Sequence, residues 1–280
     1  MEVAAKYTGG AFNSIQLTFL RFLIGGLMLL PFAISDLKKR RHSLTAGDHG
    51  YLLFLGVISI SISMTLLQVS MIGINANLAA IIICTNPLFT MIFAHFVADD
   101  PFTKRKAVVL LLMLIGLVIV ANPAEVLSGG IDPLYLGCAV VAAVTFGLYT
   151  AYGKRRIASI GGMAQNAFSF LFGCAVLLPV MLIADIPIFG GISAQTLPVL
   201  LYLGIFVTGL GYYFYMKAIE LGGPSVASIA FFLKPVIAPI LAFIVLGEPI
   251  TANLIAGVLF ILAGSYVNMA PGLKAVKAAK

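Results

Sequence analysis

Apolar runs of about twenty residues recur from one end of this 280-residue chain to the other. Each run is long enough to cross the ~30 Å hydrocarbon core of a bilayer as a helix. Only 10% of the residues are charged, whereas a soluble domain carries charge on about a quarter of its residues. A transmembrane β-barrel would instead show short segments of alternating polarity. The sequence therefore predicts an all-α polytopic membrane protein that lies in the lipid bilayer.

Nine apolar segments qualify as membrane spans, and we expect nine transmembrane helices. They lie at about 15–35, 51–72, 77–98, 107–122, 133–153, 164–184, 198–217, 225–246 and 252–270. The breaks between them are charged or turn-forming stretches, such as DLKKRRHSLTAGDHG at 36–50 and LGEP at 246–249.

The basic residues indicate how these spans are oriented. If the first span runs from outside to inside, fourteen Lys and Arg residues fall on one side of the membrane and only Lys6 on the other. Basic loop residues concentrate on the cytoplasmic side of membrane proteins. We therefore expect a multi-pass protein of the cell membrane with a cytoplasmic C-terminus. The net charge of +7 has the same explanation and does not indicate a nucleic-acid partner.

A shift of 148 residues aligns positions 21–122 with the second half of the chain without a gap. RFLIGGLMLLP (21–31) falls on SFLFGCAVLLP (169–179), and DPFT (100–103) falls on EPIT (248–251). Prolines coincide as well, and shared hydrophobicity alone would not align them. The shift predicts two units of five helices, at 1–125 and 130–272, followed by a basic tail at 273–280.

An odd number of helices in each unit places the two units in opposite orientations in the membrane. Such an inverted-topology repeat is an architecture that many transporters share. The counterpart of span 133–153 would precede residue 1, so we expect the first helix of the first unit to be truncated.

Four stretches carry a family resemblance: KYTGG (6–10), LTFLRFLIGGLMLLPF (17–32), CTNPLFTMIFAHFVADDPFTKRKAVVLLLMLIGLVIV (84–120) and SVASIAFFLKPVIAPILAFIVLGEPITANLIAGVLFILAGSYV (225–267). With them the chain resembles the EamA-like branch of the drug/metabolite transporter superfamily. The resemblance implies ten helices in two repeats and transport of small metabolites, amino acids or related compounds, with export the commoner direction. A non-transporting membrane scaffold or an inactive transporter fragment is the alternative, since the first helix is lacking.

Lys234 interrupts an apolar stretch, FFLKPVIAP at 231–239. A charge at bilayer depth costs about 2.5–3.5 kcal/mol, so it normally faces protein or a water-filled cavity. Lys234 either binds a substrate carboxylate or phosphate, or pairs with a backbone carbonyl or a polar group on a neighbouring helix. The 148-residue shift pairs it with Asn86, so we expect these two side chains to lie near one another.

Three prolines, Pro87, Pro235 and Pro239, stand inside predicted spans. Each removes one helical hydrogen bond and frees the carbonyl four residues earlier, which kinks a helix. Freed carbonyls at membrane depth must be satisfied by protein or water. We expect these helices to line a cavity and to flex during gating, with a kink that is merely packed as the alternative.

Further polar residues within the spans are candidates for substrate binding: Gln68, Thr85, Tyr149, Tyr212 and Arg21. Tyrosine hydroxyls can donate to a carboxylate, although tyrosines near span ends are often interfacial anchors. Arg21 either attracts anionic substrates at the outer mouth or anchors its helix at the interface. Glu248 is expected to help the last helix begin, beside a cap at Thr251.

Several classes of function lack their residues. The sequence holds no phosphate-binding loop, no CxxC pair and no acidic residue deep in a span. We therefore expect no cofactor, no metal, no catalytic residue and no enzymatic activity. Alternating access by facilitated diffusion is predicted, with proton coupling through Lys234 or His95 as the alternative. The identity of the substrate and the oligomeric state do not follow from the sequence.

Overall fold

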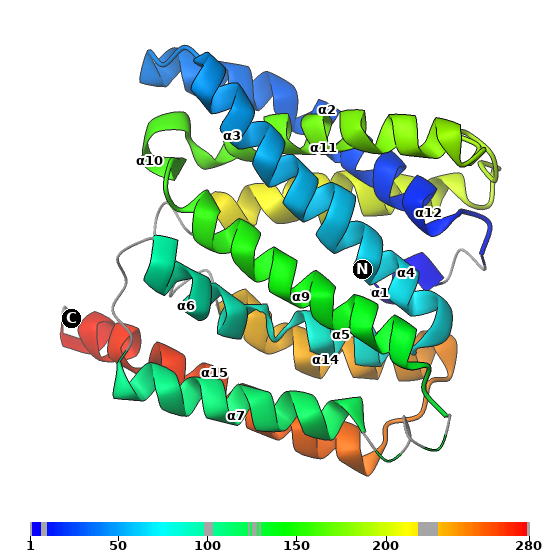
Figure 1. Ribbon diagram of the computed structural model, residues 1–280, viewed down its shortest axis with the longest axis vertical. Helices are drawn as coiled ribbons and strands as arrows, with labels where there is room; N and C mark the ends of the chain where they lie inside the picture. The colour runs from blue at the N-terminus through cyan, green and yellow to red at the C-terminus, as the bar shows by residue number, and fades with distance from the viewer. Residues whose placement is uncertain are drawn as a thin grey trace.

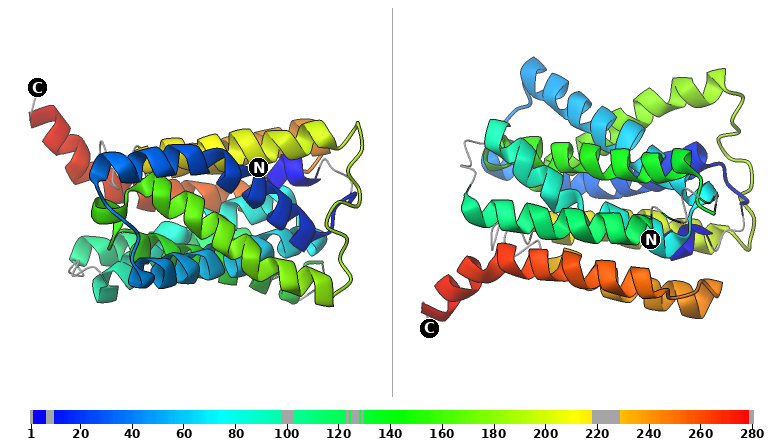
Figure 2. Two further views of the ribbon diagram at one scale, coloured as in Figure 1. Left: turned by 90° about the horizontal axis from the view of Figure 1, so that it is seen from above. Right: turned by 60° about the horizontal axis from the view of Figure 1, so that its bottom comes forward.

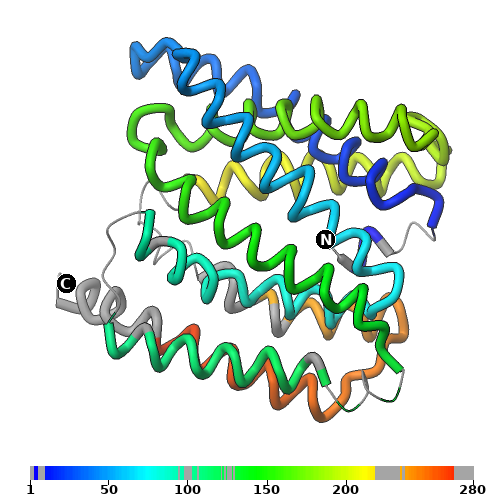
Figure 3. The backbone as a smooth tube through the Cα atoms, viewed as in Figure 1, coloured from blue at the N-terminus to red at the C-terminus, as the bar shows by residue number. Residues whose placement is uncertain are grey.

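A computed structural model describes residues 2–6, 10–97, 103–122, 124, 128, 130–217 and 229–278. These residues form helices and the turns between them, without any strand. The helices pass back and forth as one bundle (Figures 1 and 3). In chain order they are α1 (Glu2–Lys6), α2 (Ser14–Arg40), α3 (Ala46–Gly56), the π-helical η1 (Val57–Met64), α4 (Thr65–Gly73), α5 (Ala76–Ile83), α6 (Asn86–Val97), α7 (Lys104–Ala121), α9 (Pro133–Gly153), α10 (Ile157–Ile160), α11 (Gly162–Ile183), α12 (Leu197–Leu201), the π-helical η2 (Tyr202–Leu210), α14 (Ile229–Leu246) and α15 (Ala252–Ala278).

Six helices of the described part are long and apolar enough to cross a membrane: Ser14–Arg40, Ala46–Gly73, Ala76–Val97, Pro133–Gly153, Gly162–Ile183 and Leu197–Lys217. Three shorter apolar helices, Ala107–Val120, Ile237–Leu246 and Ala252–Val267, fall within the remaining predicted spans. The predicted class, an all-α polytopic membrane protein, is confirmed. Positions 98 and 225–228 of the predicted spans lie outside the described residues.

Local sequence sets where the main helices begin. Asn13 caps α2, and its backbone N–H donates to the Oε1 atom of Gln16 at 3.2 Å. Thr45 and Asp48 form the same reciprocal box at the start of α3. Asp132 caps α9 just before a proline, which suits the first helical position because its missing N–H would be unsatisfied there.

The helix α2 packs against α11 (Figure 2), and glycines bring α2 close to η2 and α11 close to η1. A Cβ atom placed on Gly25 would lie 2.8 Å from the Cγ2 atom of Thr208, and one on Gly173 would lie 2.6 Å from the Cβ atom of Ile60. Real Cβ atoms do not approach other atoms so closely, so only glycine fits at these two contacts. Small residues at helix interfaces are typical of membrane bundles.

The helices α7 and α15 form a second close pair at one edge of the bundle (Figure 1). A Cβ atom on Gly116 would lie 2.7 Å from the side chain of Ile261, and one on Gly264 would lie 3.1 Å from the side chain of Met113. Each helix thus presents a glycine to a bulky side chain of its partner.

The segments η1 and η2 have wider turns than the α-helices that they interrupt. The hydroxyl of Thr65, the residue after η1, donates to the carbonyl of Ile60 at 3.1 Å. Within η2, the hydroxyl of Thr208 donates to the carbonyl of Leu203 at 2.8 Å. π-helical turns are rare and occur often at functional sites.

Candidate functional site

A cavity of about 300 Å³ lies between helices of both halves of the chain. We call it the central cavity, and it is lined by Met64, Leu67, Ile83, Asn86, Phe146, Val207, Gly211, Tyr212, Tyr215 and Lys234. Most of these side chains are apolar or aromatic, with few polar groups among them. That combination is typical of sites that bind small molecules.

Six of the lining residues form pairs that the 148-residue shift relates. Met64 pairs with Tyr212, Leu67 with Tyr215, and Asn86 with Lys234. In each pair, the second half of the chain supplies the residue with the phenol or the amine. The two walls of the central cavity therefore differ in chemistry, although they come from matching positions.

Asn86 has a structural task besides lining the cavity. The helix breaks between α5 and α6, and Pro87 has no N–H to offer the carbonyl of Ile83. The Nδ2 atom of Asn86 donates to that carbonyl at 2.8 Å instead. The asparagine thus satisfies the backbone group that the proline leaves free.

Lys234 lies on α14 and is half-buried at the central cavity. The helix α14 runs on through Pro235 and Pro239, and Pro239 is buried. The side chain of Pro235 lies outside the described part of the structure. Lys234 and Asn86, which the sequence analysis expected to be near one another, line the same cavity.

The aromatic ring of Tyr212 belongs to a cluster with two phenylalanines. The ring centroids of Phe22 and Phe170 lie 4.8 Å apart, and that of Tyr212 lies 6.0 Å and 5.0 Å from them, all edge to face. This arrangement suits the charge distribution of aromatic rings. The cluster fixes the orientation of Tyr212 at the cavity wall.

Three other residues proposed from the sequence do not line the central cavity. The hydroxyl of Thr85 is buried and donates to the carbonyl of Ile82 at 2.6 Å. Gln68 is buried beside α2 and its backbone carbonyl accepts from the hydroxyl of Ser14. Arg21 is only 1% exposed, with its guanidinium carbon 4.7 Å from the ring centroid of Phe22.

Tyr149 is buried behind the cavity wall. Its hydroxyl donates to the Oδ1 atom of Asn166 at 2.8 Å, and the Nδ2 atom of Asn166 donates to the backbone carbonyl of Tyr212 at 3.4 Å. Tyr149 also lines a second cavity of about 30 Å³, which we call the small chamber. The small chamber is lined by Tyr149, Thr150, Gly153, Lys154, Ile157, Gln165, Tyr215 and Met216.

Two residues of this region were not proposed from the sequence. Tyr215 lines both cavities, and Asn166 is a fully buried amide that connects Tyr149 to Tyr212. The signal that could have found Tyr215 is its spacing from Tyr212, because residues three apart lie on the same face of a helix.

Glu248 departs from the prediction made for it. Its carboxylate is buried and accepts from the backbone N–H groups of Ala76 at 2.8 Å and Asn77 at 3.0 Å, the first two residues of α5. At the start of α15, the hydroxyl of Thr251 accepts from the N–H of Leu254 at 3.2 Å. Glu248 caps a helix of the other half because the first N–H groups of α5 have no intrahelical acceptor.

Comparisons with known proteins give a consistent family. A model of the EamA-like transporter family matches residues 1–122 and 134–270. An uncharacterized transporter of Clostridium kluyveri is 40% identical over 279 residues, which cover 98% of this chain and 90% of that protein. An S-adenosylmethionine uptake transporter of Rickettsia prowazekii is 27% identical over 182 residues, 64% of this chain and 58% of that protein.

A solved crystal structure has the same fold. It superposes with a TM-score of 0.68 over 96% of this chain and 92% of the other, at 18% sequence identity.

Proposed function

The chain belongs to the EamA-like transporter family, and on that premise we propose that it exports small metabolites, amino acids or related compounds, across the cell membrane by alternating access. It is a membrane transporter and not an enzyme. The observation that carries the proposal is the central cavity, in which an amine, an amide and two phenols meet apolar side chains. At about 300 Å³ it suits a solute at the small end of the ligand range.

Lys234 holds the carboxylate of the substrate in this proposal. A hydrogen bond between an ammonium and a carboxylate is about twice as strong as one between neutral groups. Tyr212 and the side-chain oxygen of Asn86 complete the polar end of the site. The apolar part of the substrate lies against Met64 and Leu67, which supply no competing polar group.

The proposed architecture is an inverted repeat of residues 1–125 and 130–272, with the C-terminus in the cytoplasm. Reciprocal contacts support it. Gly25 packs on Gly204 while Gly173 packs on Gly56, and each residue of the second contact differs by 148 from one of the first. A two-fold relation between the halves requires contacts that swap partners in this way. The contact between Phe22 and Phe170, also 148 apart, fits a position on the axis itself.

Alternating access also needs helices that bend beside the site. The break between α5 and α6 just before Pro87 places one flexible point next to Asn86. In α14, Pro235 and Pro239 provide the corresponding point of flexibility beside Lys234. Thr85, Gln68, Tyr149 and Arg21 then act as the supporting layer around the residues that contact substrate.

Some relatives are named S-adenosylmethionine uptake transporters, so S-adenosylmethionine is the solute against which amino acids are compared in testing this proposal. A sulfonium could stack on Phe146, Tyr212 and Tyr215, since cations are attracted to aromatic faces. The ammonium of Lys234 opposes a cation in the same cavity. An amino acid whose net charge is neutral or negative is therefore a better match for the central cavity than a cationic solute.

Transport by purified protein in proteoliposomes tests the proposal. We expect saturable counterflow of at least one amino acid from a panel that includes S-adenosylmethionine. Lys234→Met should remove that flux while the protein keeps its thermal stability in detergent. A folded protein that moves no solute of the panel would support the scaffold alternative, and unchanged flux in the variant would refute the assignment of Lys234.

A further inference from the structure

Tyr215 separates two cavities, because it lines both the central cavity and the small chamber. The other residues of the small chamber stand at the end of α9, in the turn after it, at the start of α11 and at the end of the helix that follows η2. We call this end of the bundle the basic side, since it carries Lys38, Lys39, Arg40, Arg41, Lys154, Arg155 and Arg156. Figure 1 shows the α2–α3 connection and α10 together at this end.

The small chamber has room for a water molecule and a buried N–H group that such a water could accept from. Gln165 is fully buried, and its Nε2 atom has no hydrogen-bond partner among the described residues. A Cβ atom on Gly153 would lie 2.9 Å from that nitrogen, so the amide lies directly against another lining residue of the chamber. A cavity needs roughly 10–15 Å³ to admit a water molecule. The chamber, at about 30 Å³, meets this requirement and offers the donor that a water would satisfy.

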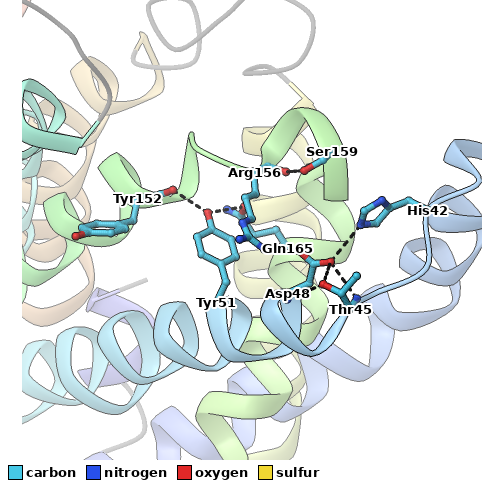
Figure 4. Close-up of polar contacts among 8 residues, drawn as sticks. All are labelled: His42, Thr45, Asp48, Tyr51, Tyr152, Arg156, Ser159 and Gln165. Carbon is cyan, nitrogen blue, oxygen red and sulfur yellow. Dashed lines mark hydrogen bonds and ion pairs between the residues drawn. The ribbon is translucent and has the colours of Figure 1, made fainter.

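A polar network closes the basic side next to the small chamber (Figure 4). The carboxylate of Asp48 is buried and pairs with Arg156 and with His42. The guanidinium of Arg156 also covers the ring of Tyr51, at 5.2 Å from its centroid. We call these residues the Asp48–Arg156 network. It joins the start of α3 in the first half to the α9–α10 turn in the second half.

The network reaches the small chamber through Tyr51. The hydroxyl of Tyr51 donates to the carbonyl of Tyr152 at 2.7 Å and lies 3.4 Å from the Oε1 atom of Gln165. Tyr51 thus connects the Asp48–Arg156 network to Gln165 of the small chamber (Figure 4). Tyr215 lines both the small chamber and the central cavity.

We propose that Tyr215 is the gate between the central cavity and the basic side, and that the small chamber is its hydrated antechamber. The inference rests on the proposed transport function. Among the residues that the structure describes, Tyr215 is the only one that lines both cavities, so rotation of its ring would join them without moving a whole helix. Leu67, the residue at the matching position of the first half, is fully buried. It lines the central cavity but not the small chamber. The gate is therefore a feature of the second half only.

Cysteine labelling tests this assignment. Cys84, Cys138 and Cys174 are replaced by serine, and Met64→Cys, at the wall of the central cavity, supplies the reporter thiol. Proteoliposomes are treated from each side in turn with 2-sulfonatoethyl methanethiosulfonate, which is charged and does not cross the bilayer. The rate of labelling of the reporter is measured with and without a second substitution at the gate.

Tyr215→Ala should accelerate labelling from the basic side by about tenfold or more, because minor open states are typically populated at 10% or less. Labelling from the opposite side should not change. The matched control is Tyr212→Ala, which removes the same side chain one turn earlier from a residue that lines the central cavity but not the small chamber. It should leave both rates within about twofold of the parent, since it opens no second cavity.

Equal acceleration in the two tyrosine variants, acceleration from the opposite side, or no acceleration in Tyr215→Ala would each overturn the proposal. If Tyr215→Ala does not fold, Tyr215→Leu replaces it, since the matching position of the first half carries leucine. Labelling does not depend on transport. A chain that transports no solute but shows the predicted rates would therefore refute the proposed function and keep the gate.

Discussion

The two walls of the central cavity come from matching positions of the two halves, yet they differ in chemistry. The first half supplies a thioether, an aliphatic chain and an amide, from Met64, Leu67 and Asn86. The matching residues of the second half supply two phenols and an amine. The glycine contacts behind these walls, in contrast, recur in both halves with their partners exchanged.

This difference shows which of the matching positions tolerate different side chains. At Gly25 and Gly173 a larger residue costs stability, since a Cβ atom there would overlap the neighbouring helix. A side chain at the cavity wall meets empty space on one side and can change without moving a helix. The packing therefore stays alike in both halves, while the binding chemistry is concentrated in one.

The largest effect is expected from making the polar pair identical. Lys234→Asn gives both halves an amide and removes the charge that holds the carboxylate. Hydrogen bonds to charged groups contribute about 1.5–3 kcal/mol, so transport of a carboxylate below its KM should fall by roughly 10- to 100-fold. Initial rates in proteoliposomes measure this, with Met64→Leu as a control at the apolar wall. A rate within twofold of the parent would show that the charge is not part of the site.

The glycine contacts should respond alike in the two halves. Gly25→Ala and Gly173→Ala both force a methyl group into a neighbouring helix, and overpacking costs about 1–3 kcal/mol of unfolding free energy. Gly137→Ala on α9 is the control, because no atom lies within 4 Å of its Cβ position. Unfolding in detergent measures the three variants. A loss confined to one of the two contacts would mean that the packing is not repeated.

The cap that Glu248 gives to α5 connects the two halves and should cost less to remove. Glu248→Ala leaves two N–H groups without this acceptor, and losing a helix cap lowers stability by about 0.5–2 kcal/mol. Thr251→Ala removes a cap within the second half and serves for comparison. If capping is the only role of Glu248, both variants lose stability and both keep transport. Loss of transport in Glu248→Ala alone would show that the contact between the halves also serves the transport cycle.

The smallest effect is expected at the aromatic wall. Tyr212→Met gives this position the residue of the first half and removes one neutral hydrogen bond to substrate. Such bonds contribute about 0.5–1.5 kcal/mol, so KM should rise by roughly 2- to 10-fold with little change in the maximal rate. Tyr212→Phe, which keeps the ring, should show the same rise if the hydroxyl makes the contact. An unchanged KM in Tyr212→Phe would assign the role of Tyr212 to its ring instead.

The sequence predicted the membrane class and the transporter family because both depend on composition and on residues that shape the backbone. It also placed Lys234 with Asn86, since one shift of the chain relates them. It missed Tyr215 because that residue stands two positions before the predicted end of its span at 217, where tyrosines are often interfacial anchors. It assigned Glu248 to the start of the helix that follows in sequence, whereas the carboxylate accepts from the N–H of Ala76, 172 residues away.

The π-helical segments bear on how the cavity walls can move. Met64 is the last residue of η1, and Tyr212 follows η2 after a single residue. If either segment returned to α-helical hydrogen bonding, the part of the helix beyond it would turn about its own axis. Met64 or Tyr212 would then rotate toward or away from the substrate, and the contacts that the glycines of α2 and α11 make with these segments would shift as well. In two helices of this bundle, a change in backbone hydrogen-bond register would thus rotate the residues that form the wall of the central cavity.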